Sequence, residues 1–196
     1  MLRIKKCGHK ELHDYYKVMK SDFEKSELPP EIVFQKALLQ NQIEFLLIVD
    51  DTVKVTIAYA VVCPKSMYGY GLLMYFAVMP WYRGKGLGTD ALRLINKRYN
   101  SLRGMLLEVT NHPDKATGDR RIRFYQREGY EIVRCGDYTL FGVPARIMVR
   151  QKKGLPDPGP VMHRIMPEIY THLFSETTVR KNIIVKPYKK PRFWQK

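Results

Sequence analysis

One stretch of the chain decides its fold: Leu72-Leu-Met-Tyr-Phe-Ala-Val-Met-Pro-Trp-Tyr-Arg-Gly-Lys-Gly-Leu-Gly-Thr-Asp-Ala-Leu-Arg-Leu-Ile95. Its first part is a continuous apolar run, which predicts a buried β-strand ending near Val78. Pro80 has no amide hydrogen and cannot continue a hydrogen-bonded ladder. A glycine-rich turn follows, and apolar residues then recur at helical spacing. The stretch therefore predicts a strand, a glycine turn and a helix in succession.

The glycine turn predicts an anion-binding site, most naturally for phosphate. Gly84, Gly86 and Gly88 let a ligand approach the backbone, because no Cβ atoms stand in the way. The first turn of the following helix presents unpaired N–H groups and the positive end of the helix dipole. A dinucleotide fold would need glycine where Thr89 stands, and the P-loop string is absent from the sequence.

The turn Arg83-Gly-Lys-Gly-Leu-Gly88, preceded by Val78-x-Pro80, resembles the coenzyme A signature of the GNAT superfamily of acyl-CoA N-acyltransferases. A second segment, Arg121-Ile-Arg-Phe-Tyr-Gln-Arg-Glu-Gly-Tyr130, resembles the F-Y-x-[KR]-x-G-[FY] helix end of that family. The alternative for the turn is a glycine-rich helix entry that binds no ligand.

The order of the elements agrees with this resemblance. Periodicity and turn residues predict strands over 2–5, 45–49, 53–62, 72–78, 104–109, 130–134 and 145–151. They predict helices over 9–20, 30–40 and 119–127, and one that follows the glycine turn. The order matches the GNAT fold, an α/β (α+β) arrangement in which helices cover both faces of a mixed, mostly antiparallel central sheet.

The chain divides into three predicted parts. Residues 1–151 form the GNAT acetyltransferase domain, and the proline- and glycine-rich residues 152–160 form a linker. Residues 161–196 form an amphipathic helix and a basic tail. This helix either covers the main sheet, or shapes the acceptor pocket or a dimer contact. Both a monomer and a homodimer are compatible with the sequence.

Composition predicts a cytoplasmic protein with a single core. The chain has 196 residues, of which 45% are hydrophobic, and no stretch approaches the roughly 20 apolar residues that span a bilayer. The start has no apolar signal region. Three widely spaced cysteines suit a reducing compartment. Cys7, His9 and His13 lack a nearby fourth ligand, so no metal is expected.

The charge is uneven along the chain. Residues 1–145 hold 22 Lys and Arg against 16 Asp and Glu, whereas residues 146–196 hold 12 against 3, giving net charges of +6 and +9. The basic tail from Arg180 to Lys196 carries interleaved aromatic residues, a pattern compatible with nucleic-acid binding. The alternative is a solvated basic surface, or packing against the chain's own domain.

The resemblance implies acetyl-CoA as the acyl donor and a primary amine, on a small molecule or a protein, as the acceptor. It implies a gap between two parallel strands that admits the pantetheine arm along Phe76, Ala77 and Val78. The pyrophosphate would be held by backbone N–H groups, those of Gly84, Lys85, Gly86, Leu87, Gly88 and Thr89. The side chains of Arg83 and Lys85 would add positive charge, or remain solvated.

The resemblance also implies catalytic residues. Tyr125 lies where related enzymes place a general acid near the thioester sulfur, and a phenol is protonated at neutral pH. The alternative is a packed core aromatic. Glu108 is the one acid inside an apolar strand and is the candidate base, unless it faces solvent on the polar side of the sheet. His112 is an alternative base.

The chain departs from the family pattern at two positions. Gly118 and Arg121 stand where many relatives have asparagine and alanine, which puts the usual asparagine contact with the pantetheine in doubt. The loop over 111–118 looks longer than usual. Arg120, Arg121 and Arg123 crowd the predicted helix start, where one of them would reach the 3′-phosphate. A coenzyme A-binding module without turnover, or a nucleic-acid-associated protein, are the alternative functions.

Overall fold

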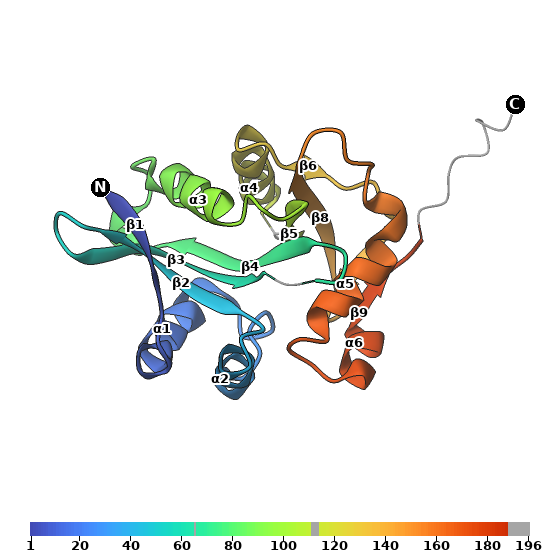
Figure 1. Ribbon diagram of the computed structural model, residues 1–196, viewed down its shortest axis with the longest axis horizontal. Helices are drawn as coiled ribbons and strands as arrows, with labels where there is room; N and C mark the ends of the chain where they lie inside the picture. Colours follow the sequence, from blue (N-terminus) through green and yellow to red (C-terminus); the bar gives the residue numbers. More distant parts are fainter. Residues whose placement is uncertain (65, 111–113, 188–196) are drawn as a thin grey trace, which may run out of the picture.

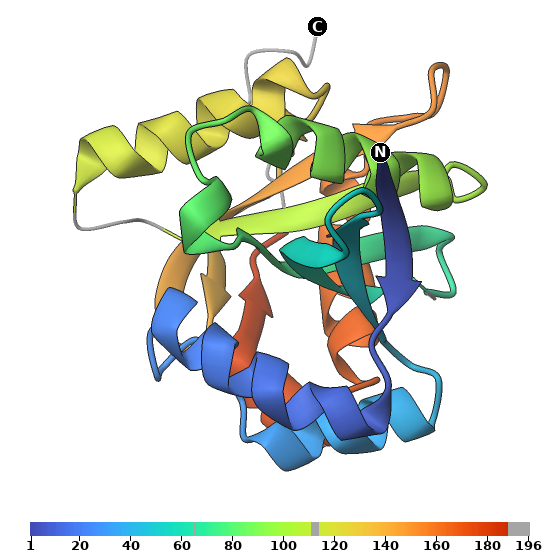
Figure 2. The ribbon, with the colours of Figure 1, turned by 90° about the vertical axis from the view of Figure 1, so that its left-hand side faces the viewer.

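The computed structural model describes residues 1–64, 66–110 and 114–187, and these form one twisted sheet covered by helices on both faces (Figures 1 and 2). The main path of the sheet has the order β1-β2-β3-β4-β5-β8-β7-β9, and β6 pairs with β8. Among the described strands, β4 and β5 pair in parallel and every other pair is antiparallel. The strands are β1 (Leu2–Lys6), β2 (Glu44–Asp50), β3 (Val55–Cys63), β4 (Tyr70–Val78), β5 (Gly104–Thr110), β6 (Glu131–Ile132), β7 (Tyr138–Leu140), β8 (Val143–Gln151) and β9 (Ile183–Val185).

The helices form two layers. On one face lie α3 (Leu87–Arg98) and α4 (Lys115–Arg127), and on the other lie α1 (His9–Asp22) and α2 (Glu31–Leu39) (Figure 2). The C-terminal helices α5 (Met162–Tyr170) and α6 (Glu176–Asn182) join the layer of α1 and α2. Short 3₁₀ turns are found at Pro80–Tyr82 and Gly159–Val161.

Each face of the sheet has its own core, because successive side chains of a strand point to opposite faces. In β2, Phe45 and Leu47 pack toward α1 and α2, whereas Leu46 and Ile48 pack toward α3. In β5, Leu106 belongs to the α1 side, and its two neighbours belong to the α3 side. This alternation confirms the mixed, mostly antiparallel sheet with helices on both faces.

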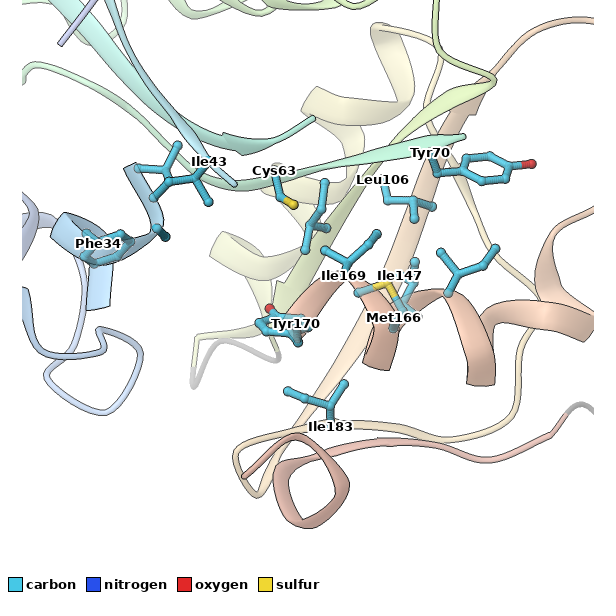
Figure 3. Close-up of a cluster of buried hydrophobic side chains, with 14 of the residues drawn as sticks. Phe34, Ile43, Cys63, Tyr70, Leu106, Ile147, Met166, Ile169, Tyr170 and Ile183 are labelled. Carbon is cyan, nitrogen blue, oxygen red and sulfur yellow. The ribbon is translucent and has the colours of Figure 1, made fainter. Parts of the chain in front are cut away.

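The C-terminal segment is part of the same core. Ile165, Met166 and Ile169 of α5 are fully buried. Figure 3 shows Met166 and Ile169 beside Leu106 and Ile147 of the sheet. β9 then adds a strand beside β7, with Ile184 opposite Thr139. The expectation that this helix covers the sheet is therefore confirmed, whereas the domain boundaries at 151 and 160 remain a prediction.

The start of α4 corrects two expectations. Asp114 caps the helix by accepting hydrogen bonds from the N–H groups of Ala116 at 3.1 Å and Thr117 at 3.0 Å. The helix therefore begins at Lys115, four residues before the predicted start at Asp119, and residues 115–118, which were expected to belong to a long loop, are helical. Arg120 lies in the second turn of α4, so the arginines do not crowd its start.

Four further differences concern short or C-terminal elements. β7 was not predicted, because a three-residue strand is too short to show a period. The strand expected over 130–134 is only Glu131–Ile132. α5 ends at Tyr170 with Pro167 inside it, so Leu173 lies beyond the helix that its spacing predicted. α6 and β9 carry too few residues for a periodic signal.

Candidate active site

The site lies where β4 and β5 separate. Their parallel ladder runs from Tyr70–Gly104 to Leu73–Leu107 and ends there, although both strands continue. A β-bulge in the pairing of β4 with β3 occurs at the same level, since Val62 pairs with Leu73 and Val61 with Tyr75. A bulge bends its strand and redirects side chains. Met74 and Tyr75 accordingly both face the α1 side, and the gap opens directly beyond them.

Glu108 is the first residue of β5 beyond the ladder. It is two residues beyond Leu106 in the strand, so its side chain faces the same side, the layer of α1, α2 and α5. Its Oε1 accepts a short hydrogen bond from the Tyr138 hydroxyl, and its Oε2 accepts one of 2.6 Å from the Tyr170 hydroxyl. Burial raises the pKa of Glu108 to about 7, although these two hydrogen bonds lower it. A carboxyl group with this pKa exchanges protons readily near neutral pH.

Two adjoining cavities open beside Glu108. The first, the Glu108 cavity, has a volume of about 100 Å3, and its wall includes Thr110 and Arg121. The second, the apolar cavity, has a volume of about 180 Å3 and is lined by Leu28, Leu173 and Phe174. Both share a wall formed by the α1–α2 connection, the bulge of β4, the β7–β8 turn and Tyr170. Segments from four distant parts of the sequence therefore build one site.

Glu27, in the α1–α2 connection, lines both cavities. Its Oε1 accepts a hydrogen bond of 3.2 Å from the Thr110 hydroxyl, and its backbone carbonyl accepts one of 2.6 Å from the Tyr75 hydroxyl. These bonds tie the connection between the helices to both separating strands. The site thus holds a second carboxyl group besides Glu108.

The glycine turn has the geometry expected of an anion site. Gly84 and Gly86 have φ of 76° and 77°, in the left-handed region that favours glycine, and a Cβ at either would meet no atom within 4 Å. Gly86 is the N-cap of α3. Within the described residues, the N–H groups from Gly84 to Gly88 donate to no backbone carbonyl. The turn therefore has the free donors that a pyrophosphate requires.

Three side chains and backbone groups of this turn have partners within the protein. Arg83 donates to the Val78 carbonyl at 2.9 Å and pairs with Asp22 of α1, so its charge is directed away from the turn. The Thr89 N–H donates to the Gly86 carbonyl at 3.0 Å. The Lys85 ammonium lies 5.8 Å from the centre of the Tyr82 ring. Arg83 and Thr89 are consequently weaker candidates for contacts with the pyrophosphate than the glycines are.

The predicted pantetheine edge lies on β4 beyond the ladder with β5. Ala77 faces the α1 side, whereas Phe76 and Val78 face α3 and α4. The Phe76 ring stacks on Phe124 of α4, with 6.5 Å between the centroids. Gly88 packs closely here, since a Cβ would lie 3.2 Å from Val78. The edge and the start of α3 are therefore in contact.

Tyr125 projects from α4, on the face of the sheet opposite Glu108. Its ring packs at 5.1 Å from Phe124 and 5.8 Å from Tyr130, between ring centroids. Burial raises the pKa of Tyr125 to about 12, and the Arg121 charge lowers it. Its hydroxyl has no hydrogen-bond partner among the described residues. The two catalytic candidates thus lie on opposite faces of the sheet.

Sequence reasoning missed Glu27, Tyr138 and Tyr170. Tyr138 lies in a segment that showed no strand pattern, and Tyr170 directly follows the last buried isoleucine of α5. Arg121, noted only as a departure from the family, lines the Glu108 cavity and donates to the Thr110 carbonyl at 3.3 Å. His112, the alternative base, lies outside the described residues. Within those residues, no cluster of three potential metal ligands occurs, and no helix is long and apolar enough to cross a membrane.

Known proteins share this sequence pattern and fold. Residues 41–132 match the family model of the acetyltransferase (GNAT) domain. No curated protein sequence matches the chain significantly. A putative GNAT acetyltransferase from Bacteroides thetaiotaomicron superposes with a TM-score of 0.64 at 19% identity, over 76% of this chain and 87% of that one.

Two further structures were solved with ligands. Arabidopsis thaliana NAA60, in complex with acetyl-CoA, gives a TM-score of 0.60 at 15% identity, over 79% of this chain and 100% of that one. Spermidine N-acetyltransferase from Vibrio cholerae, in complex with CoA and spermine, gives a TM-score of 0.61 at 13% identity, over 76% of this chain and 94% of that one. Residues 41–132 therefore match the GNAT acetyltransferase domain, and the chain has the fold of these acetyltransferase structures.

Proposed function

We propose that this protein is a cytoplasmic N-acetyltransferase in which Glu108 is the general base and Tyr125 is the general acid. The observation that carries the proposal is the position of Glu108, the first residue beyond the β4–β5 ladder, with its carboxyl group in the wall of a cavity. The acceptor is a primary amine that enters this cavity.

The residues of the glycine turn and of β4 fit the donor. The free N–H groups from Gly84 to Gly88 and the positive end of α3 suit the pyrophosphate. The unpaired edge over Phe76, Ala77 and Val78 suits the amides of the pantetheine arm, which would pair as an added strand does. When bound, acetyl-CoA supplies an activated acetyl group as a thioester.

The proposed proton transfers use Glu108 on one face of the sheet and Tyr125 on the other. The Glu108 carboxylate accepts a proton from the substrate ammonium group, which leaves a neutral amine. The amine nitrogen forms a bond with the carbonyl carbon of the thioester, and the bond between that carbon and sulfur breaks. The nitrogen gives its second proton to solvent and becomes the amide nitrogen of the product. The Tyr125 hydroxyl gives its proton to the departing sulfur. Solvent then removes the proton from Glu108 and restores that of Tyr125.

Tyr138 and Tyr170 act as positioning residues in this proposal. Each donates a hydrogen bond to a different oxygen of Glu108. Hydrogen bonds to a carboxylate favour its charged form, so they limit the rise in pKa that burial causes. Without these bonds, the pKa of Glu108 would rise further, and a smaller fraction of the side chain would be a carboxylate able to accept the proton of the amine at neutral pH.

The test has two stages. Calorimetric titration with acetyl-CoA, coenzyme A and dephospho-coenzyme A measures donor binding, and release of the free thiol in the presence of primary amines then measures transfer. Acetyl-CoA binding with amine-dependent thiol release that Glu108→Gln abolishes supports the proposal. Binding without turnover on any amine would identify a coenzyme A-binding module instead.

A further inference from the structure

We infer that the acceptor is a monocationic primary amine whose body is an aromatic ring or a branched aliphatic group of similar size. This inference rests on the proposed function and adds the substrate class. It is carried by the composition, volume and charge of the two cavities beside Glu108.

The apolar cavity is built to enclose a ring. Phe141 and Phe174 pack edge to face with their ring centres 5.3 Å apart, and the Phe174 ring also stacks on Tyr170 at 6.3 Å. Leu140 and Leu173 complete this wall. An apolar cavity of roughly 150 Å3 accommodates benzene, so the 180 Å3 found here is enough for one ring.

The position of Glu108 fixes the orientation of this acceptor. Glu108 lines the smaller cavity and is absent from the wall of the apolar cavity, whereas Tyr170 lines both. An amine nitrogen beside Glu108 therefore leaves the rest of the molecule to extend past Tyr170, along the wall that Phe141 and Phe174 form. A short linker of one or two carbons connects these two parts.

The charges in the two walls limit the acceptor to a single positive charge. Among the described residues that line the cavities, Glu27 and Glu108 have acidic side chains and Arg121 has a basic one. Their formal sum is one negative charge. A polyamine brings several ammonium groups, whereas Glu27 is the one acid among the described residues that line the apolar cavity. At least one ammonium group would therefore be buried without an acidic partner, which is costly.

The experiment compares amines at saturating acetyl-CoA, with thiol release as the readout. The panel contains phenethylamine, ethylamine, spermidine and L-phenylalanine. We expect kcat/KM for phenethylamine to exceed that for ethylamine by roughly 10- to 100-fold, the range that burial of one apolar group in a pocket gives. Preference for spermidine or for L-phenylalanine would overturn the inference while leaving the proposed function intact.

Two variants locate the effect in the apolar cavity. Phe174→Ala and Phe141→Ala should each raise KM for phenethylamine about 10-fold, a larger effect than on ethylamine, and should leave the Kd for acetyl-CoA unchanged. Unchanged acetyl-CoA binding shows that the variants are folded. Ile184→Ala, at a position that is 46% exposed on β9, is the matched control and should behave as the parent protein.

A binding measurement separates this inference from the proposed function. Phenethylamine is titrated calorimetrically into the protein saturated with coenzyme A. Binding that Phe174→Ala abolishes would support the substrate class even if no amine were acetylated. Absence of both binding and turnover with phenethylamine would overturn the inference.

Discussion

The Tyr170 hydroxyl donates a hydrogen bond of 2.6 Å to Oε2 of Glu108, across 62 positions of sequence. Tyr170 is the last residue of α5, which lies beyond the segment that matches the acetyltransferase family model. The C-terminal segment therefore covers the sheet and also contacts the candidate base. Any truncation before α5 would remove both a large part of the core and this contact.

Replacing the base should separate activity from stability. Glu108→Gln should lower kcat/KM by about 100- to 1,000-fold, because general base catalysis contributes on this order. The amide keeps the shape of the side chain and avoids the burial of a charge, so the melting temperature at pH 8 should be unchanged or higher. Glu44→Gln is the control, since Glu44 accepts a hydrogen bond from Tyr99 away from the site. Activity of Glu108→Gln equal to that of the parent protein would exclude Glu108 as the base.

The pH dependence of the rate should follow the ionisation of Glu108. Its pKa is raised to about 7 by burial, and only the carboxylate accepts a proton. The value of kcat/KM should therefore rise with pH to a midpoint near 7, measured with an acceptor amine whose own pKa lies outside the range. Glu108→Gln should lack this acidic limb, and a limb that persists in the variant would belong to another group.

Unlike the rate, which should rise with pH, the stability contributed by Glu108 should fall as pH rises. The folded-state pKa of Glu108 lies above its ordinary value of 4.5, so the native state retains a proton that the unfolded state has lost. This contribution to the free energy of unfolding is complete below pH 4.5 and is lost as pH rises toward 7. Urea unfolding should therefore show that the parent protein loses about 1–3 kcal/mol of free energy of unfolding, relative to Glu108→Gln, between pH 4.5 and pH 8. A difference that does not change with pH would mean that Glu108 titrates normally.

Removing the Tyr170 hydroxyl should shift the acidic limb. Tyr170→Phe deletes a hydrogen bond that lowers the pKa of Glu108, so the limb should move to higher pH by up to about one unit. The rate at pH 7 should fall, whereas the plateau at high pH should change less. Tyr99→Phe deletes a comparable bond of 2.7 Å to Glu44 and should leave the pH profile unaltered. A uniform loss of rate at all pH values would indicate a purely structural role for Tyr170.

Alanine substitutions at two glycines with similar positive φ, one inside the glycine turn and one outside it, test the donor site. Gly86→Ala forces alanine into the left-handed region, which costs roughly 1–2 kcal/mol, and should weaken acetyl-CoA binding because the N–H groups of the turn are displaced. Gly154→Ala imposes the same strain at φ 81°, also with no neighbouring atom within 4 Å, but outside the turn. Calorimetry should show weaker binding for the first variant alone. Equal binding by both variants would count against the pyrophosphate site.

Tyr125→Phe tests the general acid. The ring and its contacts with Phe124 and Tyr130 are retained, so stability and acetyl-CoA binding should change little. The value of kcat should fall by about 100-fold, in the range for general acid catalysis. Turnover at the parental rate would show that Tyr125 only packs in the core.

Much of the fold was predictable because its signals are local. The apolar run before Val78, the missing amide hydrogen of Pro80 and the freedom of glycine at positive φ act within a few residues of one another. They predicted β4, the turn and α3, and the order of most other elements followed in the same way. The start of α4 was misplaced because its cap, Asp114, lies next to a glycine-containing segment with no apolar face.

Local sequence patterns were enough to predict the strand, the glycine turn and the helix, and they suggested Glu108 and Tyr125 as candidates for proton transfer. That these two side chains lie on opposite faces of the sheet is a property of the tertiary structure. The tertiary structure also brought Tyr138 and Tyr170 to Glu108, across 30 and 62 positions. Such contacts depend on which strands pair and in which register, and no short window of sequence contains that information.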